Sequence, residues 1–295
     1  MTLTQELSTS ARSILDQLGD SVVAIGRDGR GTGIVIASGK VLTNAHNLHD
    51  RSTSVTFADG RSVQATIVGT DGDGDLVVLD VDTADVRPVG WSDEAPAAGD
   101  VVFALSRGGR QLRISFGMVT SADLSFDGPR GRTVSGGVEH SAPLARGSSG
   151  GPLVDADGRV IGVNTHRTGR GFYIARPADA VLQSRIDDLA AGKSVARPQL
   201  GVALAPAGVA AKLRRSVGLP ERDGLLVRNV QDDSPASRAG IAQGDLLVAI
   251  GETPLSSIDA LYDGLAGVTD SVSITVVRGT EERDVTVSFA ANQPA

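Results

Sequence analysis

The stretch GSSGGP at residues 147–152 is the most informative part of this 295-residue chain. Its three glycines leave a short loop with few side chains, in which backbone N–H groups can turn toward one point. A negatively charged oxygen in a tetrahedral intermediate needs such a convergence of donors. A Gly/Ser run is also typical of a plain turn or a flexible linker. The loop alone leaves these interpretations open, and the rest of the chain has to decide between them.

Length and composition limit the possible classes of protein. A chain of 295 residues favours two domains, each of which buries its own core. Gly accounts for 37 residues and aromatic residues for 3%, which is typical of a turn-rich β chain. The formal net charge of -7 argues against a general nucleic-acid-binding protein, so we expect no nucleic-acid partner. The absence of cysteine excludes disulfides, thiolate metal sites and a cysteine nucleophile, and we expect no cofactor.

Residues 1–20 are predicted to form an N-terminal helical segment, in which an amphipathic helix is broken by Gly19. The apolar members of this helix are Leu3, Leu7, Ile14 and Leu18. The segment has neither the basic region nor the apolar run of a signal peptide, and no stretch of the chain has the length of a membrane span. Taken as it stands, the chain is expected to be soluble and cytoplasmic. A chain from which a leader had been trimmed would instead be extracytoplasmic.

Short apolar strands alternate with turn signals throughout residues 21–191, which is the pattern of antiparallel hairpins. The first set of strands predicts a β-barrel, with strands at 22–25, 33–37, 41–42, 54–57, 63–68 and 76–81. The second set predicts another barrel, with strands at 101–105, 114–120, 133–139, 152–154, 160–165 and 171–174. A helix over residues 178–191 is expected to close this half.

Residues 192–198 are predicted to be a linker, because they contain Gly, Lys, Ser and Pro without an apolar period. A small α+β domain is expected over residues 199–291. Its predicted strands lie at 200–205, 225–230, 246–250, 272–277 and 285–289, and its predicted helices at 208–217, 235–239 and 257–265. Ser234 is the expected N-cap of the second of these helices, while Gly240 and Gly267 are expected to end the second and the third.

If Ser149 is a nucleophile, it needs a general base within hydrogen-bond reach and a third group that orients the base, because a serine hydroxyl is weakly nucleophilic at neutral pH. Four histidines compete for the role of base, namely His46, His49, His140 and His166. The residues alone do not choose between them.

Asp71, Asp73 and Asp75 occupy alternate positions in a Gly-rich turn, as the ligands of a calcium loop do. A calcium loop also needs a distant bidentate Glu, whereas here the chain enters an apolar strand after Asp75. We therefore expect a solvated turn for Asp71 and Asp73, and no metal site.

Three segments, in this order, resemble the signature segments of the HtrA/Deg serine proteases: TNAH at 43–46, DLVVL at 75–79 and GSSGGPL at 147–153. The resemblance implies a mainly β fold of two antiparallel Greek-key barrels, like that of chymotrypsin. It also implies a triad in which His46 is general base and then acid, Asp75 holds the tautomer of His46, and Ser149 attacks. The implied oxyanion hole consists of Gly147, Ser148 and Ser149, with the N–H groups of Gly147 and Ser149 as donors.

The same resemblance implies a specificity pocket formed by one strand and one loop beside the nucleophile. Its expected residues are Pro143, Leu144, Asn164, Thr165 and His166. Family members generally prefer small or medium aliphatic side chains. Six residues before Ser149 the chain has Pro143 instead of an Asp, so a preference for Arg or Lys, which needs a buried carboxylate, is not expected.

The C-terminal region resembles the PDZ domain of this protease family in six segments: QLGV at 199–202, GLLV at 224–227, SPA at 234–236, AGI at 239–241, GDLL at 244–247 and IG at 250–251. The resemblance implies that backbone N–H groups near Leu200 bind a peptide's terminal carboxylate, and that the following strand pairs with the peptide. The candidate peptide-binding residues are Leu200, Gly201, Val202, Ala203, Leu204, Ile258, Leu261, Tyr262 and Leu265. Helical spacing favours a core role over ligand contact for Leu261 and Leu265.

The resemblance thus predicts a serine endopeptidase of protein quality control, with unfolded or misfolded polypeptides as substrates and C-terminal peptides as PDZ ligands that modulate activity. A homotrimer is compatible with the family, although no sequence feature determines the oligomeric state. A catalytically weak PDZ adaptor or chaperone is the alternative. An esterase is disfavoured, because Ser149 does not lie between a strand and a helix as a Gly-x-Ser-x-Gly elbow requires.

Overall fold

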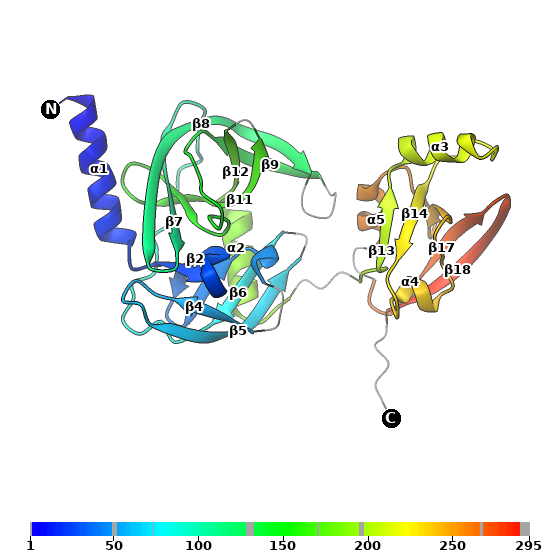
Figure 1. Ribbon diagram of the computed structural model, residues 1–295, viewed down its shortest axis with the longest axis horizontal. Helices are drawn as coiled ribbons and strands as arrows, with labels where there is room; N and C mark the ends of the chain where they lie inside the picture. Colours follow the sequence, from blue (N-terminus) through cyan, green and yellow to red (C-terminus); the bar gives the residue numbers. More distant parts are fainter. Residues whose placement is uncertain are drawn as a thin grey trace. The chain divides into compact units, whose positions relative to one another are not determined.

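The computed structural model describes residues 2–48, 52–72, 74–127, 133–169, 171–194, 198–265 and 268–289. The chain divides into two compact units, Met1–Ala196 and Arg197–Ala295 (Figure 1). His49, Asp73, Gly267 and the centre of the predicted linker lie outside the described residues. The limits predicted for the individual domains stay predictions.

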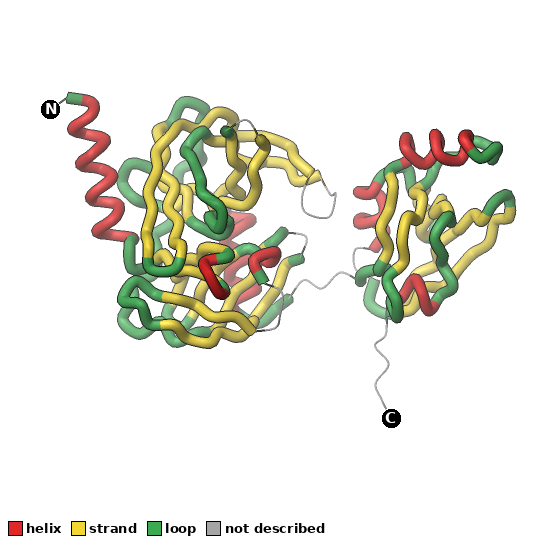
Figure 2. The backbone as a smooth tube through the Cα atoms, in the orientation of Figure 1, coloured by secondary structure: helices red, strands yellow, loops and turns green. Residues whose placement is uncertain are grey.

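The first unit contains two closed antiparallel barrels, which Figure 2 shows as two groups of strands. The first barrel has the strand order β1-β2-β3-β6-β5-β4 and the second the order β10-β11-β12-β9-β8-β7. In the first barrel β3 pairs with β6 and not with β4, which is the Greek-key crossover. The predicted fold class is confirmed.

The strands of the first barrel are β1 Val22–Ile25, β2 Gly31–Ala37, β3 Lys40–Thr43, β4 Ser52–Thr56, β5 Ser62–Asp71 and β6 Leu76–Asp80. Those of the second barrel are β7 Val101–Gly108, β8 Gln111–Asp127, β9 Thr133–His140, β10 Pro152–Val154, β11 Val160–Gly169 and β12 Phe172–Pro177. The prediction ended β8 at Thr120, which was too early. The ladder with β9 continues to Asp127 through polar and apolar residues alike, and backbone pairing there needs no regular apolar pattern.

Two helices pack on the core that the barrels share. Helix α1 (Leu3–Leu18) begins with a capping box formed by Thr2 and Gln5. Helix α2 (Ala180–Ala190) has Asp179 as its N-cap and buries Leu182, Ile186 and Leu189 in the same cluster as Ile14 and Leu18. Leu3, which was predicted to belong to the apolar face of α1, is 73% exposed, because the first turns of the helix extend beyond the barrels (Figure 1).

The second unit is an antiparallel sheet with helices. Its sheet has the order β13-β14-β15-β17-β18, and the short strand β16, which the sequence did not predict, pairs with β15. The strands are β13 Val202–Ala205, β14 Leu225–Val230, β15 Leu246–Ile250, β16 Thr253–Pro254, β17 Ser271–Arg278 and β18 Glu281–Ser288. The helices are α3 Ala207–Ser216, α4 Pro235–Arg238 and α5 Ile258–Leu265. Ser234 caps α4 as expected, because its hydroxyl accepts a hydrogen bond from the Ser237 N–H at 3.1 Å.

Among the described helices, none combines the length and the apolar character that crossing a bilayer requires.

The packing of α1 yields a stability prediction. Ile14→Ala removes a fully buried side chain from the barrel core and should destabilise the first unit by about 2–5 kcal/mol. Leu3→Ala is the matched control, because Leu3 is exposed on the same helix, and should change stability by less than about 0.5 kcal/mol. Trp91 is the only tryptophan and packs against this core, so its fluorescence during urea unfolding reports on the first unit. Equal midpoints for Ile14→Ala and the wild type would show that α1 does not stabilise the barrels.

Candidate active site

The first barrel brings His46 and Asp75 together. His46 lies in the 3-10 helix η2 (Ala45–Asn47) directly after β3, and Asp75 immediately precedes β6. Because β3 and β6 are paired, with Thr43 opposite Val77, the two loops meet at one end of the barrel. His46 Nδ1 lies 2.6 Å from Asp75 Oδ2, and the His46 backbone N–H donates to Asp75 Oδ1 at 3.0 Å. The carboxylate therefore determines both the ring orientation and the backbone position of His46.

Asp75 is held in an unusual backbone conformation. Its φ is +53°, in the left-handed region that non-glycine residues adopt infrequently. The Asn44 side-chain amide and the Ala45 N–H both donate to the Asp75 carbonyl, at 2.9 and 3.1 Å. These hydrogen bonds tie the turn to the loop that carries His46, and they offset the cost of the conformation.

Two hydrogen bonds and an ion pair stabilise the turn before Asp75. The Gly74 N–H donates to Asp71 Oδ1 at 2.8 Å, and Arg176 Nη1 of the second barrel donates to the Gly74 carbonyl at 2.5 Å. Asp71 also forms an ion pair with Arg185 of α2, with 3.4 Å between Nε and Oδ2. Burial lowers the pKa of Arg176, and the nearby carboxylates of Asp71, Asp179 and Asp75 oppose that shift. The expectation of a solvated Asp71 was wrong: its side chain is buried and structural, because two arginines from distant segments lie beside it.

The second barrel contributes Thr165 and Ser149. The Thr165 hydroxyl, on β11, donates to Asp75 Oδ2 at 3.0 Å, so the carboxylate accepts three hydrogen bonds in all. The Thr165 carbonyl accepts a hydrogen bond from the Ser149 hydroxyl at 3.1 Å. Thr165 therefore connects Ser149 to the His46–Asp75 pair. In this structure the Ser149 hydroxyl is directed at that carbonyl, and no hydrogen bond joins it to His46 within the described contacts.

The loop that carries Ser149 packs closely against the first barrel. Gly147 and Gly150 have φ values of +82° and +86°, and a Cβ on either would overlap a carbonyl oxygen, that of Gly29 or that of Thr32 respectively. The Ser149 carbonyl accepts hydrogen bonds from the Thr32 N–H and from Asn47 Nδ2, both at 2.9 Å. Glycine is therefore required at these two positions both by backbone conformation and by space.

The carbonyls of Gly147 and Ser149 point toward the first barrel, and the N–H groups of the same two residues are left available. The Gly147 carbonyl accepts a hydrogen bond from the Thr32 hydroxyl at 2.8 Å. The Ser148 N–H donates to the Ala145 carbonyl at 3.3 Å. Among the described contacts, the N–H groups of Gly147 and Ser149 have no protein acceptor. Two unpaired amides flanking Ser148 are the donor set that an oxyanion would need.

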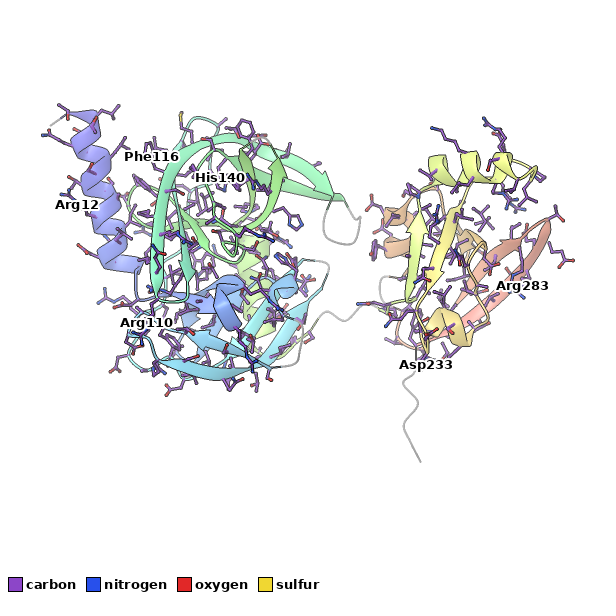
Figure 3. All side chains as sticks on the ribbon, viewed as in Figure 1. Arg12, Arg110, Phe116, His140, Asp233 and Arg283 are labelled. Carbon is purple, nitrogen blue, oxygen red and sulfur yellow. The ribbon has the colours of Figure 1, made fainter. Side chains whose placement is uncertain are left out.

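The three histidines among the described residues have different surroundings. His46 faces Asp75, and the His166 ring lies 6.0 Å from the His46 ring, with its Nδ1 3.0 Å from the Thr165 carbonyl. His140 is fully buried within the second barrel (Figure 3). His46 lies next to the Asp75 carboxylate, which is the arrangement that a general base needs.

His140 instead supports the nucleophile loop. Its Nε2 lies 2.9 Å from Asn164 Oδ1, and Asn164 Nδ2 donates to the Gly151 carbonyl at 3.0 Å. Since this carboxamide oxygen is an acceptor, Nε2 carries the proton, and the buried Nδ1 has no hydrogen-bond partner. Burial lowers the pKa of His140 to about 4, although the Asn164 hydrogen bond and the Glu139 charge oppose the shift. His140 is therefore neutral at pH 7.

A cavity of about 160 Å³ lies beside the nucleophile loop, and we refer to it as the specificity pocket. Four of the predicted residues line it: Leu144, Asn164, Thr165 and His166. Pro143 is not among the lining residues, and its carbonyl accepts a hydrogen bond from the Ser115 hydroxyl at 2.6 Å. Arg167 also lines the pocket, as does Tyr173, which the sequence did not predict, with the guanidinium 5.6 Å from the aromatic ring centre. Tyr173 lies in a predicted strand, but only the pairing of β12 with β11 brings it here.

The predicted peptide-binding residues of the second unit lie on β13, on the loop before it and on α5. β13 pairs only with β14 in the described sheet, so its other edge is open. Leu200 is buried, and its carbonyl accepts a hydrogen bond from the Ala236 N–H at 2.9 Å. Gly201 has a φ of +75°, and a Cβ there would overlap Ser234.

The remaining members of this set differ in exposure. Leu261 and Leu265 are buried in the core of the unit, whereas Ala203 is exposed. Those of intermediate exposure are Val202, Leu204, Ile258 and Tyr262. The open edge of β13 is therefore the part of this set that offers backbone groups to another strand.

Comparisons with known proteins agree with this architecture. Residues 31–163 match the family described as trypsin-like peptidase domain, and residues 198–289 match the PDZ domain family. The chain is 33% identical over 283 residues to the putative serine protease HhoA of Synechocystis, a match that covers 89% of this chain and 71% of HhoA. It is 32% identical over 280 residues to a probable periplasmic serine endoprotease, DegP-like, of Brucella suis. That match covers 89% of this chain but only 52% of the relative.

Solved structures show the same fold. The HtrA-type protease AlgW with a decapeptide has a TM-score of 0.63 at 22% identity, over 96% of this chain and 99% of AlgW. The serine endoprotease from Yersinia pestis has a TM-score of 0.59 at 23% identity, over 94% and 96% of the two chains. The fold and the site geometry define a trypsin-like serine endopeptidase with one PDZ domain. The chain belongs to the HtrA/Deg family of serine proteases, and it spans about half the length of its DegP-like relatives.

The Thr165 hydroxyl yields a first prediction for the site. Thr165→Val removes one donor to the Asp75 carboxylate and should slow the reaction of Ser149 with a fluorophosphonate by about 10- to 100-fold, because hydrogen bonds to charged groups contribute about 1.5–3 kcal/mol. Thr165→Ser keeps the hydroxyl and should react within about threefold of the wild-type rate, since a factor of three is well under that energy. If the Val variant reacts as fast as the Ser variant, the hydrogen bond from Thr165 to Asp75 does not contribute to the reactivity of Ser149.

His140 yields a pH prediction. Its pKa is about 4 in the folded chain, against an ordinary value of 6.5, so the unfolded chain binds more protons between these two values. Stability should therefore fall as the pH falls from about 6.5 to about 4, by at most about 3 kcal/mol from this residue. His140→Gln does not titrate and should reduce this slope in urea unfolding followed by Trp91 fluorescence. An unchanged slope in the variant would assign the effect to other groups.

Proposed function

We propose that this enzyme cleaves unfolded or misfolded polypeptides at Ser149 through an acyl-enzyme, as part of protein quality control. The observation that carries the proposal is the Asp75 carboxylate, which accepts hydrogen bonds from His46 and from Thr165. A carboxylate so placed holds the imidazole with a proton on Nδ1, which leaves Nε2 free to accept the serine proton.

In the proposed acylation step, His46 Nε2 takes the proton of the Ser149 hydroxyl while the oxygen attacks the substrate carbonyl carbon. The N–H groups of Gly147 and Ser149 stabilise the negative oxygen of the tetrahedral intermediate. Protonated His46 then donates its proton to the leaving amine, and Asp75 stabilises the imidazolium in the meantime. A water molecule activated by His46 releases the acyl group by the reverse sequence.

Before attack, the Ser149 hydroxyl must leave the Thr165 carbonyl and turn toward His46. This rotation replaces one neutral hydrogen bond, whose net contribution is about 1 kcal/mol. The resting orientation of the Ser149 hydroxyl is therefore favoured by only a small free energy. Substrate binding is expected to favour the rotation, because an extended substrate segment needs backbone hydrogen bonds from the strand around Thr165.

The proposed substrate class follows from the shape of the specificity pocket. A cavity of about 160 Å³ that includes Leu144 and Ala145 admits a small or medium side chain. The pocket lies beside the nucleophile loop, so the substrate must present an extended segment there. Unfolded polypeptides supply such segments, whereas folded proteins seldom do.

The second unit is proposed to bind the C-termini of polypeptides and to modulate cleavage. The peptide strand would add to the open edge of β13 by β-augmentation. The left-handed Gly201 and its neighbours would direct their N–H groups toward the terminal carboxylate. The similar protease AlgW was solved with a decapeptide, which supports peptide binding as a property to test in this chain.

This function predicts covalent labelling by a fluorophosphonate probe. The wild type should be labelled at Ser149, whereas Ser149→Ala should not react and His46→Ala should react at least about 10³-fold more slowly. A hydrophobic C-terminal peptide should change the labelling rate by at least about twofold if the PDZ domain modulates activity. The readout is intact mass with time, and circular dichroism checks the fold of each variant.

The outcomes separate the alternatives. No labelling with or without the peptide would favour the catalytically silent PDZ adaptor over the protease. Labelling that the peptide leaves unchanged would support the protease and contradict the proposed coupling.

A further inference from the structure

A second cavity, of about 380 Å³, lies on the first barrel. It is formed by Arg27 and Arg30 of the turn between β1 and β2, by Asn47, and by Ser, Thr and Gln side chains of β4 and β5. It shares no lining residue with the specificity pocket. We refer to it as the arginine pocket.

Two contacts connect the segments around the arginine pocket to the loop that carries Ser149. Asn47, which directly follows His46 in the chain, donates through Nδ2 to the Ser149 carbonyl at 2.9 Å. The backbone of the turn that carries Arg27 and Arg30 packs on Gly147 so closely that a Cβ there would overlap the Gly29 carbonyl oxygen. A group held in this pocket therefore contacts Asn47, which is itself hydrogen-bonded to Ser149.

The chemistry of cleavage relates the pocket to one side of the substrate. The residue before the cleaved bond places its side chain in the specificity pocket, which the second barrel forms. The leaving amine must lie next to His46, because His46 gives it a proton. Asn47 follows His46 directly in the chain and lines the arginine pocket, which makes this pocket a candidate for contact with the residues that follow the amine.

Among the described residues that line this pocket, the charged side chains are positive. Arg27 and Arg30 are exposed, and the other described lining side chains are neutral. Neither arginine forms an ion pair or a side-chain hydrogen bond with a described residue. A guanidinium without a partner binds carboxylates well, because its planar set of donors matches the two carboxylate oxygens.

We propose that the arginine pocket selects substrates with Asp or Glu among the first three residues after the cleaved bond. The inference rests on the proposed protease function and adds to it a preference on the leaving-group side. The leaving group departs during acylation, so the preference acts on kcat/KM. Ion pairs at exposed sites are weak, and the expected preference for Glu over Gln is about three- to tenfold, which corresponds to about 0.6–1.4 kcal/mol.

The test uses fluorescence-quenched peptides that are identical up to the cleaved bond and carry Glu, Gln or Lys at one position after it. Wild type should cleave them in the order Glu, Gln, Lys, and the Glu preference should weaken as salt rises. The double variant Arg27→Gln/Arg30→Gln should cleave all three at rates within about twofold, since the described side chains that line the pocket are then all neutral. Arg12→Gln is the control, because Arg12 is an exposed arginine on α1 (Figure 3) outside this pocket, and it should keep the wild-type order.

Fluorophosphonate labelling of the same proteins separates two kinds of failure, since the probe has no peptide on the leaving-group side. Normal labelling with equal cleavage of the three peptides would overturn this inference and leave the protease function intact. A Glu preference that survives in the double variant would also overturn it. Absence of both labelling and cleavage would overturn the protease function and the inference with it.

Discussion

The organisation of the site depends on the Asp75 carboxylate. This buried group accepts hydrogen bonds from the His46 ring, the His46 backbone and the Thr165 hydroxyl, so residues of both barrels are attached to it. Its left-handed backbone is stabilised by Asn44 and Ala45. A buried carboxylate needs such partners, because removing a charge from water costs several kcal/mol unless hydrogen bonds replace the lost hydration. Changes to this group are therefore transmitted to His46 and Thr165 together.

The Asp75 carboxylate can bind residues of both barrels only if the barrels keep a fixed relative position. Buried polar contacts between the barrels hold them in that position. Arg107 of β7 donates to the carbonyls of Val22 and Gly19, both at 2.6 Å. Burial lowers the pKa of Arg107, and the charge of Asp20 opposes the shift. Thr32 of β2 contacts both Ser149 and Gly147. Close packing around the left-handed glycines then leaves little freedom for the nucleophile loop.

The sequence predicted most of the fold, because apolar strands bounded by turn residues mark hairpins locally. Motif resemblance predicted a triad of His46, Asp75 and Ser149, and in the structure hydrogen bonds through Thr165 connect these residues, while their catalytic roles stay predictions. The sequence could not predict the burial of Asp71, which depends on Arg176 and Arg185 from distant segments. The roles of Thr165, His140 and Tyr173 also depend on pairing between strands far apart in the sequence. Such contacts have no local signal.

The most direct test of the central role of Asp75 is proton NMR of protein labelled with ¹⁵N-histidine. A proton on His46 Nδ1 in a short hydrogen bond to Asp75 should give a resonance far downfield of the amide region. We predict that Asp75→Asn removes this resonance, while His140→Gln and His166→Gln retain it. A resonance that persists in Asp75→Asn, or one that disappears in His166→Gln, would contradict the central role of Asp75.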